Sequence, residues 1–189
     1  MNKKTFTIFT IILVTIVLAI KYYDLHKKQF KSNHKKEWKD SDHITKILDY
    51  LYLGDGVGSR QCQHLNEHGI NSVINMAPSS DPTQCFNSNN SFLDIDIHDS
   101  LDVNISQYFP KTYQFIENNH KRGNKILVHC HAGISRSASI VIAYLMKKNN
   151  WSYTKAFEFV KQRRSIVRPN KSFTQQLISF ENLKPISNY

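Results

Sequence analysis

The sequence has few cysteines, glycines and prolines, and no repeated unit. Three cysteines, Cys62, Cys85 and Cys130, are an odd number without a Cys-x-x-Cys spacing, so we expect neither a disulfide framework nor a structural zinc site. Six glycines and five prolines in 189 residues exclude collagen-like and low-complexity chains. This cysteine usage fits a reducing compartment.

Acidic residues are also scarce. Fifteen Asp and Glu face 25 Lys and Arg, which gives a net charge of +10, and such a surplus can mark a nucleic-acid or membrane partner. The charge is uneven, because residues 1–40 carry +6 and residues 41–189 only +4. The larger part of the chain therefore gives no reason to expect a nucleic-acid partner.

One long run lacks charge altogether. Residues 5–20 are mostly Ile, Val, Leu and Phe. As a helix they measure about 24 Å, and Tyr22 and Tyr23 at the interface would bring them close to the ~30 Å hydrocarbon core. After a short flank, residues 1–4, we predict a single-pass transmembrane anchor over residues 5–23. A cleaved signal peptide and a buried core helix are the alternatives.

The charges beside this run predict its orientation. Seven lysines follow it and two precede it, so the positive-inside rule places the rest of the chain in the cytosol. Residues 24–42, rich in Lys and His, are interpreted as a basic linker that is either solvated or held at anionic headgroups. A folded domain over residues 43–184 and a tail over residues 185–189 follow. The sequence leaves the oligomeric state unknown.

From residue 44 onward, short apolar runs alternate with helical patterns. This order is typical of an α/β domain, here expected to have a central, mostly parallel sheet flanked by helices. Ser106 is predicted to cap a helix that ends before Gly123, and Gly69 to end another. One or two short strands are predicted over residues 44–53, single strands over residues 70–75, 92–97 and 126–129, and helices over residues 59–68, 106–120, 137–146, 152–164 and 172–182.

One short segment combines an anion-binding loop with a nucleophile. A strand runs into a loop that opens a buried helix, where backbone N–H groups converge and the helix dipole favours negative charge. The same field favours the thiolate over the thiol of a cysteine placed there. The loop consists of Cys130, His131, Ala132, Gly133, Ile134, Ser135 and Arg136.

Each residue type in this segment suits a particular chemical role. Cys130 is the candidate nucleophile, and the planar guanidinium of Arg136 can hold two phosphate oxygens. Gly133 lets the backbone approach a ligand, and Ser137 can donate a hydrogen bond to the sulfur. The other loop residues are expected to act through their N–H groups, and His129 to support the loop. A buried cysteine beside a core histidine, or a zinc site, is the alternative.

This segment resembles the cysteine-dependent protein phosphatases, and within them the dual-specificity branch. The similarity covers most of residues 44–182 and includes counterparts for residues 50–54 and 161–170. It implies two-step hydrolysis through a phosphorylated cysteine, without a cofactor or metal, in which one aspartate acts first as acid and then as base. The family position, about thirty residues before the cysteine, favours Asp99 over Asp102.

The resemblance also bears on the substrate. Relatives that act on inositol lipids tend to carry Lys in the loop, which this chain lacks, and the domain is too small for the insertions that deepen the pocket of larger tyrosine-specific enzymes. We therefore expect phosphoproteins phosphorylated on Ser, Thr or Tyr. A membrane-tethered lipid phosphatase, similar to the phosphatidylglycerophosphate phosphatases, and a catalytically silent phospho-residue binder are the alternatives. Four basic residues are interpreted as a solvated helix face rather than a docking site: Lys161, Arg163, Arg164 and Arg168.

Overall fold

The computed structural model describes residues 21, 43–77, 85 and 90–182. The chain divides into two units, Met1–Lys39 and Asp40–Tyr189, and the fold described here is that of the second. Within the described ranges no helix has both the length and the apolar character needed to cross a bilayer. Apart from Lys21, the predicted anchor and the predicted linker lie outside the described residues.

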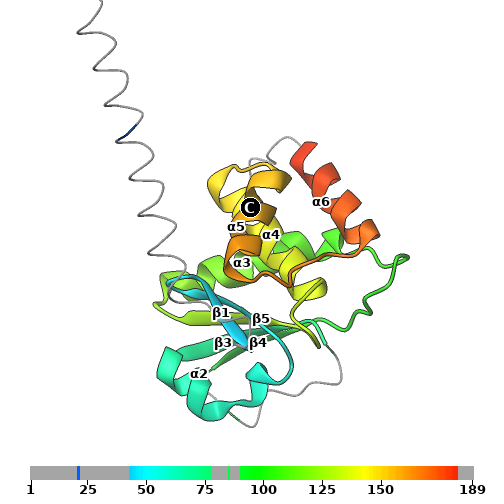
Figure 1. Ribbon diagram of the computed structural model, residues 1–189. Helices are drawn as coiled ribbons and strands as arrows, with labels where there is room; N and C mark the ends of the chain where they lie inside the picture. The colour runs from blue at the N-terminus through cyan, green and yellow to red at the C-terminus, as the bar shows by residue number, and fades with distance from the viewer. Residues whose placement is uncertain (1–20, 22–42, 78–84, 86–89, 183–189) are drawn as a thin grey trace, which may run out of the picture. The chain divides into compact units, whose positions relative to one another are not determined.

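A five-stranded sheet forms the centre of the second unit (Figure 1). The strands lie in the order β1-β2-β5-β3-β4, and only the edge pair β1 and β2 is antiparallel. The predicted α/β class is confirmed, in the form of a mixed sheet with one antiparallel edge. Its strands are β1 (Ile44–Leu48), β2 (Leu51–Gly54), β3 (Ile70–Asn75), β4 (Ser91–Asp94) and β5 (Lys125–His129).

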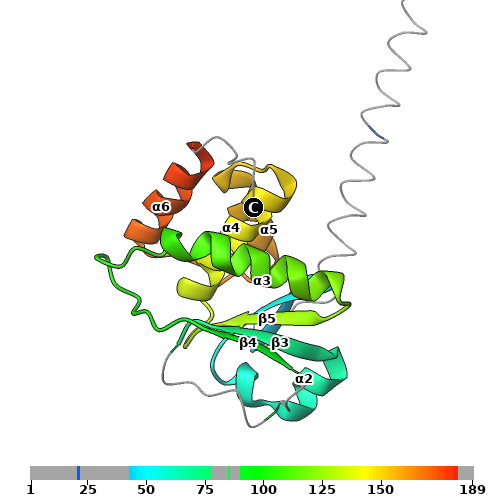
Figure 2. The same cartoon turned by 180° about the vertical axis from the view of Figure 1, so that it is seen from behind.

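Helices cover both faces of this sheet, and α2 lies on the face opposite α3, α4, α5 and α6 (Figures 1 and 2). Within the latter group α4 lies at the centre, in contact with α3, α5, α6 and the sheet. Because α4 is enclosed by these neighbours, its residues from Arg136 through Met146 are all buried. The helices are α2 (Cys62–His68), α3 (Phe109–Lys121), α4 (Arg136–Asn149), α5 (Tyr153–Arg163) and α6 (Lys171–Asn182), with short 3-10 turns η1 (Gly58–Arg60) and η3 (Ser106–Tyr108).

Several predicted boundaries are wrong by a few residues. β4 ends at Asp94 rather than at residue 97. The helix predicted to start at Ser106 begins instead at Phe109 after the turn η3, and the hydroxyl of Ser106 donates to Asn104 Oδ1 rather than capping it. Proline within the first turn of α3 suits this later start, because its missing N–H would be unpaired there in any case. Gly69 ends α2 in a left-handed conformation, as predicted.

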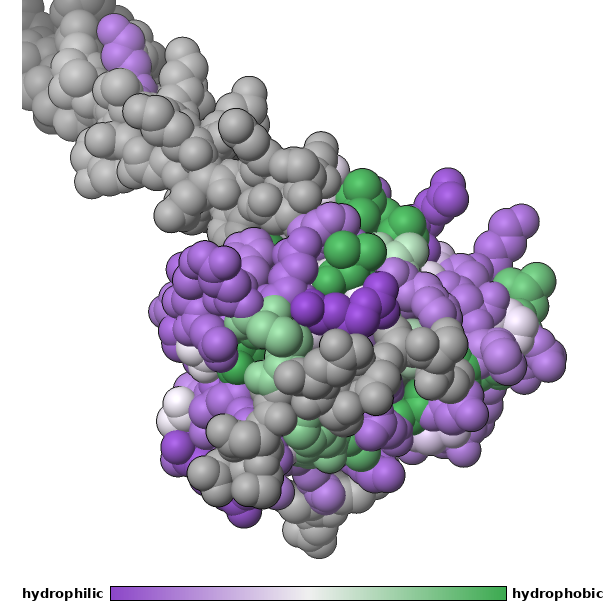
Figure 3. Space-filling view, turned by 90° about the horizontal axis from the view of Figure 1, so that it is seen from below, coloured by the Kyte–Doolittle hydropathy of each residue, from purple (hydrophilic) through white to green (hydrophobic). Residues whose placement is uncertain are grey.

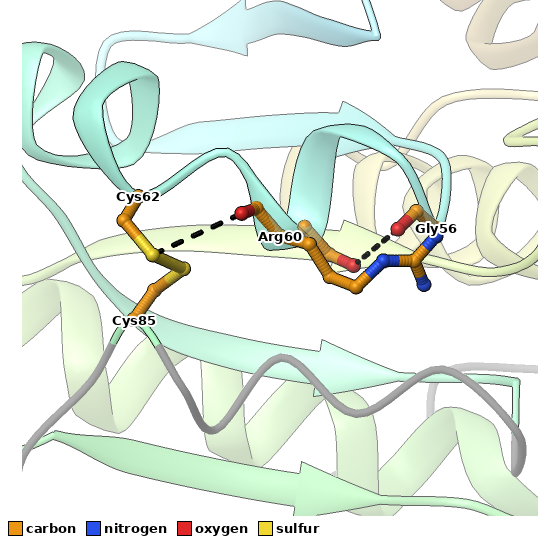
Figure 4. Close-up of a disulfide and its surroundings, with 5 residues drawn as sticks. Gly56, Arg60, Cys62 and Cys85 are labelled. Carbon is orange, nitrogen blue, oxygen red and sulfur yellow. Dashed lines mark hydrogen bonds between the residues drawn. A yellow bond between two sulfur atoms is a disulfide. The ribbon is translucent and has the colours of Figure 1, made fainter.

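The cysteine count predicts no disulfide framework, but one disulfide forms, so the cysteines no longer support a reducing compartment. Cys62, the first residue of α2, is bonded to Cys85 across a Cα separation of 4.8 Å, as Figure 4 shows. An odd number of cysteines excludes the pairing of all three, but it does not exclude one pair that the fold brings together. The neighbouring carbonyl oxygen of Arg60 lies 3.8 Å from the sulfur of Cys62; because an oxidised sulfur carries no proton, this is a contact and not a hydrogen bond. Cys130 is the free cysteine.

The lower face of the domain mixes hydrophilic residues with small, separate hydrophobic areas (Figure 3). Burial of apolar side chains is instead concentrated between the sheet and the layer of α3, α4, α5 and α6. A smaller cluster under α2 includes Leu65, Ile70 and Leu127. The two clusters hold the central strand β5 from both sides, and this strand leads directly into the loop around Cys130.

Candidate active site

The loop from Cys130 to Arg136, here called the phosphate loop, joins the end of β5 to the start of α4 (Figure 1). Every backbone carbonyl from residue 131 to residue 135 accepts a hydrogen bond from the surrounding protein. The pairs are Gly56 N to His131 O (3.0 Å), Arg164 Nη2 to Ala132 O (3.4 Å), Arg164 Nε to Gly133 O (2.9 Å), Arg168 N to Ile134 O (2.9 Å) and Ser139 N to Ser135 O (2.8 Å).

This pattern determines where the N–H groups of the loop point. In a trans peptide unit the carbonyl and the following N–H point in opposite directions. With their carbonyls turned toward the protein, the peptide units direct the N–H groups of residues 132–136 to the other side of the loop. The first turn of α4 has no side-chain cap from Ser135, its N-cap residue. Together these N–H groups form a site for an anion at a helix amino terminus.

Glycine is required at position 133 for two reasons. Its φ of +65° lies in the left-handed region, which side chains with a Cβ rarely adopt. A Cβ there would also lie 2.6 Å from Arg164 Nη2 and 2.7 Å from the carbonyl oxygen of Gly54. The loop therefore packs tightly against the protein on the side opposite its N–H groups.

Arg136 is buried and is held from behind by two carbonyl groups. Its Nη1 donates to the carbonyl oxygens of Met76 and Ile97, at 2.9 Å each, which follow β3 and β4 respectively. Its Nε is buried and has no partner among the described residues. Unpaired buried donors are rare in folded proteins. An oxyanion in the phosphate loop would supply the missing acceptor, as the sequence predicts for this guanidinium.

The side chain of Ser137 contacts the candidate nucleophile directly. Its hydroxyl donates to Cys130 Sγ at 3.2 Å, and both residues are buried. His129 precedes the nucleophile and is fully buried. Burial lowers the pKa of His129 to about 4, against a smaller opposite effect of a backbone hydrogen bond to Cys130. The imidazole is therefore neutral near pH 7, which does not suit it to carry a proton in the reaction.

Of the two candidate general acids, the structure places Asp99 beside the phosphate loop. Its Oδ1 accepts hydrogen bonds from Ser135 Oγ at 2.8 Å and from Asn170 Nδ2 at 2.7 Å, while the residue itself remains exposed. Asp102 is also exposed, and a hydrogen bond from Ser100 lowers its pKa. No local sequence pattern indicates Asn170, or the contact between the side chain of Ser135 and Asp99.

Arg164 was also misinterpreted. It is 5% exposed, so the predicted solvated helix face does not include it. Arg164 follows the last residue of α5 in an extended conformation, and its side chain lies against the carbonyls of the phosphate loop. Its guanidinium also donates to Thr45 Oγ1 at 3.1 Å and lies 4.0 Å from Asp55 Oδ2. Helical periodicity could not reveal this position, because it lies beyond the helix.

The other three basic residues of this region differ from one another. Lys161 donates to the carbonyl oxygen of Val167 at 2.9 Å. The guanidinium of Arg163 lies 3.5 Å from the centre of the Phe159 ring, and burial lowers its pKa. Arg168 has an exposed side chain and contributes its backbone N–H to the phosphate loop. Each of these residues therefore has a local structural role.

Comparison with known proteins agrees with this geometry. Residues 51–183 match the family described as "Dual specificity phosphatase, catalytic domain". The chain belongs to this family. It is 42% identical over 136 residues to dual specificity protein phosphatase 1-A of Xenopus laevis, covering 72% of this chain and 36% of that protein. It is 34% identical over 142 residues to protein phosphatase Slingshot of Drosophila melanogaster, covering 75% and 13%. The chain thus matches about a third or less of the length of these relatives.

Solved structures of the family share the fold. The crystal structure of DUSP15 has a TM-score of 0.69 at 33% identity and covers 73% of this chain and 86% of its own. The crystal structure of PTPMT1 in complex with PI(5)P has a TM-score of 0.63 at 25% identity and covers 75% and 96%. These similarities confirm the predicted family and its α/β fold.

Proposed function

We propose that this chain is a dual-specificity protein phosphatase, which hydrolyses phosphotyrosine and phosphoserine or phosphothreonine in proteins through a cysteinyl-phosphate intermediate. The observation that carries the proposal is the phosphate loop itself. Its carbonyls are turned away, the Nε of Arg136 has no partner within the described part of the chain, and Cys130 begins it. Family membership supports the same activity.

In the first step the thiolate of Cys130 attacks phosphorus. The S–P bond forms while the bond between phosphorus and the ester oxygen breaks, and the loop N–H groups and Arg136 stabilise the charge on the transferring group. Asp99 donates a proton to the departing oxygen, which leaves as the hydroxyl group of the substrate side chain. Poor leaving groups depend most on this proton.

In the second step water attacks the phosphorylated cysteine. Asp99, now a carboxylate, removes a proton from the water as the O–P bond forms and the S–P bond breaks. Inorganic phosphate is released and the thiolate is restored. The hydrogen bond from Ser137 to the sulfur stabilises negative charge on the departing thiolate, so this residue acts mainly in the second step.

Several observations support a phosphoprotein substrate. The phosphate loop contains no lysine for additional phosphates, and its residues at positions 131 and 132, a histidine and an alanine, are exposed. The similar chain of PTPMT1 was crystallised in complex with PI(5)P, so lipid phosphatase activity is kept as an outcome of the test. A silent binder is disfavoured because nucleophile, arginine and aspartate are all present around one loop.

The deciding experiment uses the purified full-length chain in detergent with an excess of chelator. We expect hydrolysis of an aryl phosphate, loss of turnover in Cys130→Ser, and retention of inorganic phosphate binding in that variant. Turnover that persists in Cys130→Ser would contradict the mechanism. Rates on phosphotyrosine and phosphothreonine peptides, compared with phosphatidylglycerophosphate in the same detergent, identify the substrate class.

We also propose that residues 5–23 anchor the protein in a membrane with the catalytic domain in the cytosol. The support is the uncharged run and the lysines that follow it. Washing membranes with alkaline carbonate should leave the full-length chain in the pellet. Release into the supernatant, or cleavage near residue 20 found by amino-terminal sequencing, would contradict the anchor.

A further inference from the structure

Two side chains that the reaction above does not use hold the carboxylate of Asp99. Ser135 Oγ and Asn170 Nδ2 both donate to the same oxygen, Oδ1, at 2.8 and 2.7 Å. Asp99 itself is an exposed residue on the connection between β4 and η3. These contacts therefore fix its carboxyl group relative to the phosphate loop, of which Ser135 is a member.

Asn170 is well suited to this task because its side chain cannot turn over. Its Oδ1 accepts a hydrogen bond from Phe173 N at 2.9 Å, which caps the amino terminus of α6. With the oxygen used in this way, the amide nitrogen must face Asp99. The backbone N–H of Asn170 also donates to Ser135 Oγ at 3.0 Å. One residue thus connects α6, the phosphate loop and Asp99.

The two donors also distinguish the two oxygens of the carboxyl group. A carboxyl oxygen that already accepts two hydrogen bonds is a poor site for a proton, because the added hydrogen would face two others. The proton of the acid form is thereby directed to Oδ2. We propose that Asn170 and Ser135 are positioning residues, which hold Asp99 so that its Oδ2 gives the proton in the first step and receives it in the second. This inference rests on the proposed phosphatase activity.

Loss of this positioning should slow the first step only for substrates whose leaving group needs a proton. General acid catalysis contributes about 10²–10⁴-fold to a reaction that needs it, and small displacements of a catalytic group remove much of such a gain. Removing one charge-assisted hydrogen bond should remove part of this rate gain, so the reaction of a poor leaving group should slow about tenfold. A good leaving group departs without a proton and should be affected by less than about twofold.

The test compares two substitutions that both keep the helix cap. Asn170→Asp retains an oxygen for Phe173 N but replaces the donor facing Asp99 with an acceptor. Asn170→Ser also retains a good capping residue and adds no charge. For both full-length variants we expect kcat/KM on phenyl phosphate to fall about tenfold, and kcat/KM on para-nitrophenyl phosphate to change far less, because kcat/KM reports the step in which the leaving group departs. Ser135→Ala should act in the same direction.

A double-mutant cycle separates positioning from a structural effect. In an Asp99→Ala background, Asn170→Asp should cause no further loss of kcat/KM, because the group it positions is absent. The same loss of kcat/KM in both backgrounds, an equal loss of kcat/KM for all leaving groups, or no loss at all would overturn the positioning role. A wild-type chain without Cys130-dependent hydrolysis would instead overturn the proposed function, and this proposal with it.

Discussion

Helix α4 carries buried polar side chains at both ends, but the two ends differ in whether these side chains have hydrogen-bond partners. At the carboxyl-terminal end, Tyr144 donates to Glu117 Oε1 at 2.7 Å and lies 2.7 Å from the hydroxyl of Tyr50. Lys148 donates to both oxygens of Glu117 at 2.9 and 2.8 Å. At the amino-terminal end, the Nε of Arg136 has no partner among the described residues.

This difference separates stability from function within one helix. Because Tyr144 gives its only hydrogen to Glu117, Tyr50 must be the donor between the two tyrosines, so each hydroxyl at this end has a partner. A completed network of this kind stabilises the fold. At the other end, the Nε of Arg136, which no described residue pairs, is instead available to an oxyanion. Substitutions at the two ends should therefore have opposite consequences for activity and stability.

The largest effect is expected for Arg136→Lys. Lysine keeps the charge but loses the planar set of donors that binds two oxygens at once. By analogy with removal of a single transition-state donor, kcat/KM on an aryl phosphate should fall by about 10³-fold. Steady-state kinetics measures this loss, and inorganic phosphate should become a much weaker inhibitor. A decrease of less than about tenfold would mean that the guanidinium does not bind the transferring group.

Acid should first weaken the region around the phosphate loop, through His129 at the end of β5. His129 has a folded-state pKa of about 4 against an ordinary 6.5, so the unfolded chain binds its proton more readily. Stability is therefore fully present above pH 6.5, falls as pH decreases toward 4, and loses about 3 kcal/mol over that interval.

Urea unfolding at several pH values measures this slope, with His129→Gln as the matched control. Burial disfavours the charged form of Glu117, but the hydrogen bonds from Lys148 and Tyr144 outweigh this effect, so the pKa of Glu117 is lowered. The stability that Glu117 contributes at the carboxyl-terminal end is therefore lost only as the pH falls below its ordinary pKa of 4.5. An unchanged slope between pH 6.5 and 4.5 in His129→Gln would contradict the assignment.

The smallest effect is expected for Tyr144→Phe, and it should fall on stability alone. The substitution removes one hydroxyl, so the hydroxyl of Tyr50 loses its contact with Tyr144 and Glu117 keeps only its hydrogen bonds from Lys148, which should lower the free energy of unfolding by about 1–3 kcal/mol. Because the network lies at the far end of α4 from Cys130, kcat on an aryl phosphate should change by less than about twofold. A large loss of kcat at unchanged stability would break the contrast between the two ends.

The sequence revealed those parts of the site that lie within one continuous segment. The order of strand, Cys130, Gly133, Arg136 and helix follows from local chemistry, and the hydrogen bond between Ser137 and the sulfur joins residues only seven positions apart. The family resemblance supplied Asp99. These predictions needed no knowledge of how distant segments pack.

The supporting residues could not be found in the same way. Arg164 reaches Thr45, 119 positions earlier, and Asn170 reaches Asp99, 71 positions earlier. The pairing of Cys62 with Cys85 likewise depends on where α2 lies against the sheet. Helical and strand periodicities report which side of an element is buried, but not which segments the fold brings to the phosphate loop.

The most direct test of the account is alkylation of Cys130 by iodoacetate, followed by peptide mass spectrometry under non-reducing conditions. Cys130 is the free cysteine, so its peptide should be carboxymethylated at neutral pH, and inorganic phosphate or arsenate should slow this reaction in proportion to its occupancy of the loop. Alkylation of Cys130 at the same rate with and without these oxyanions would contradict the claim that the phosphate loop binds an anion against the nucleophile.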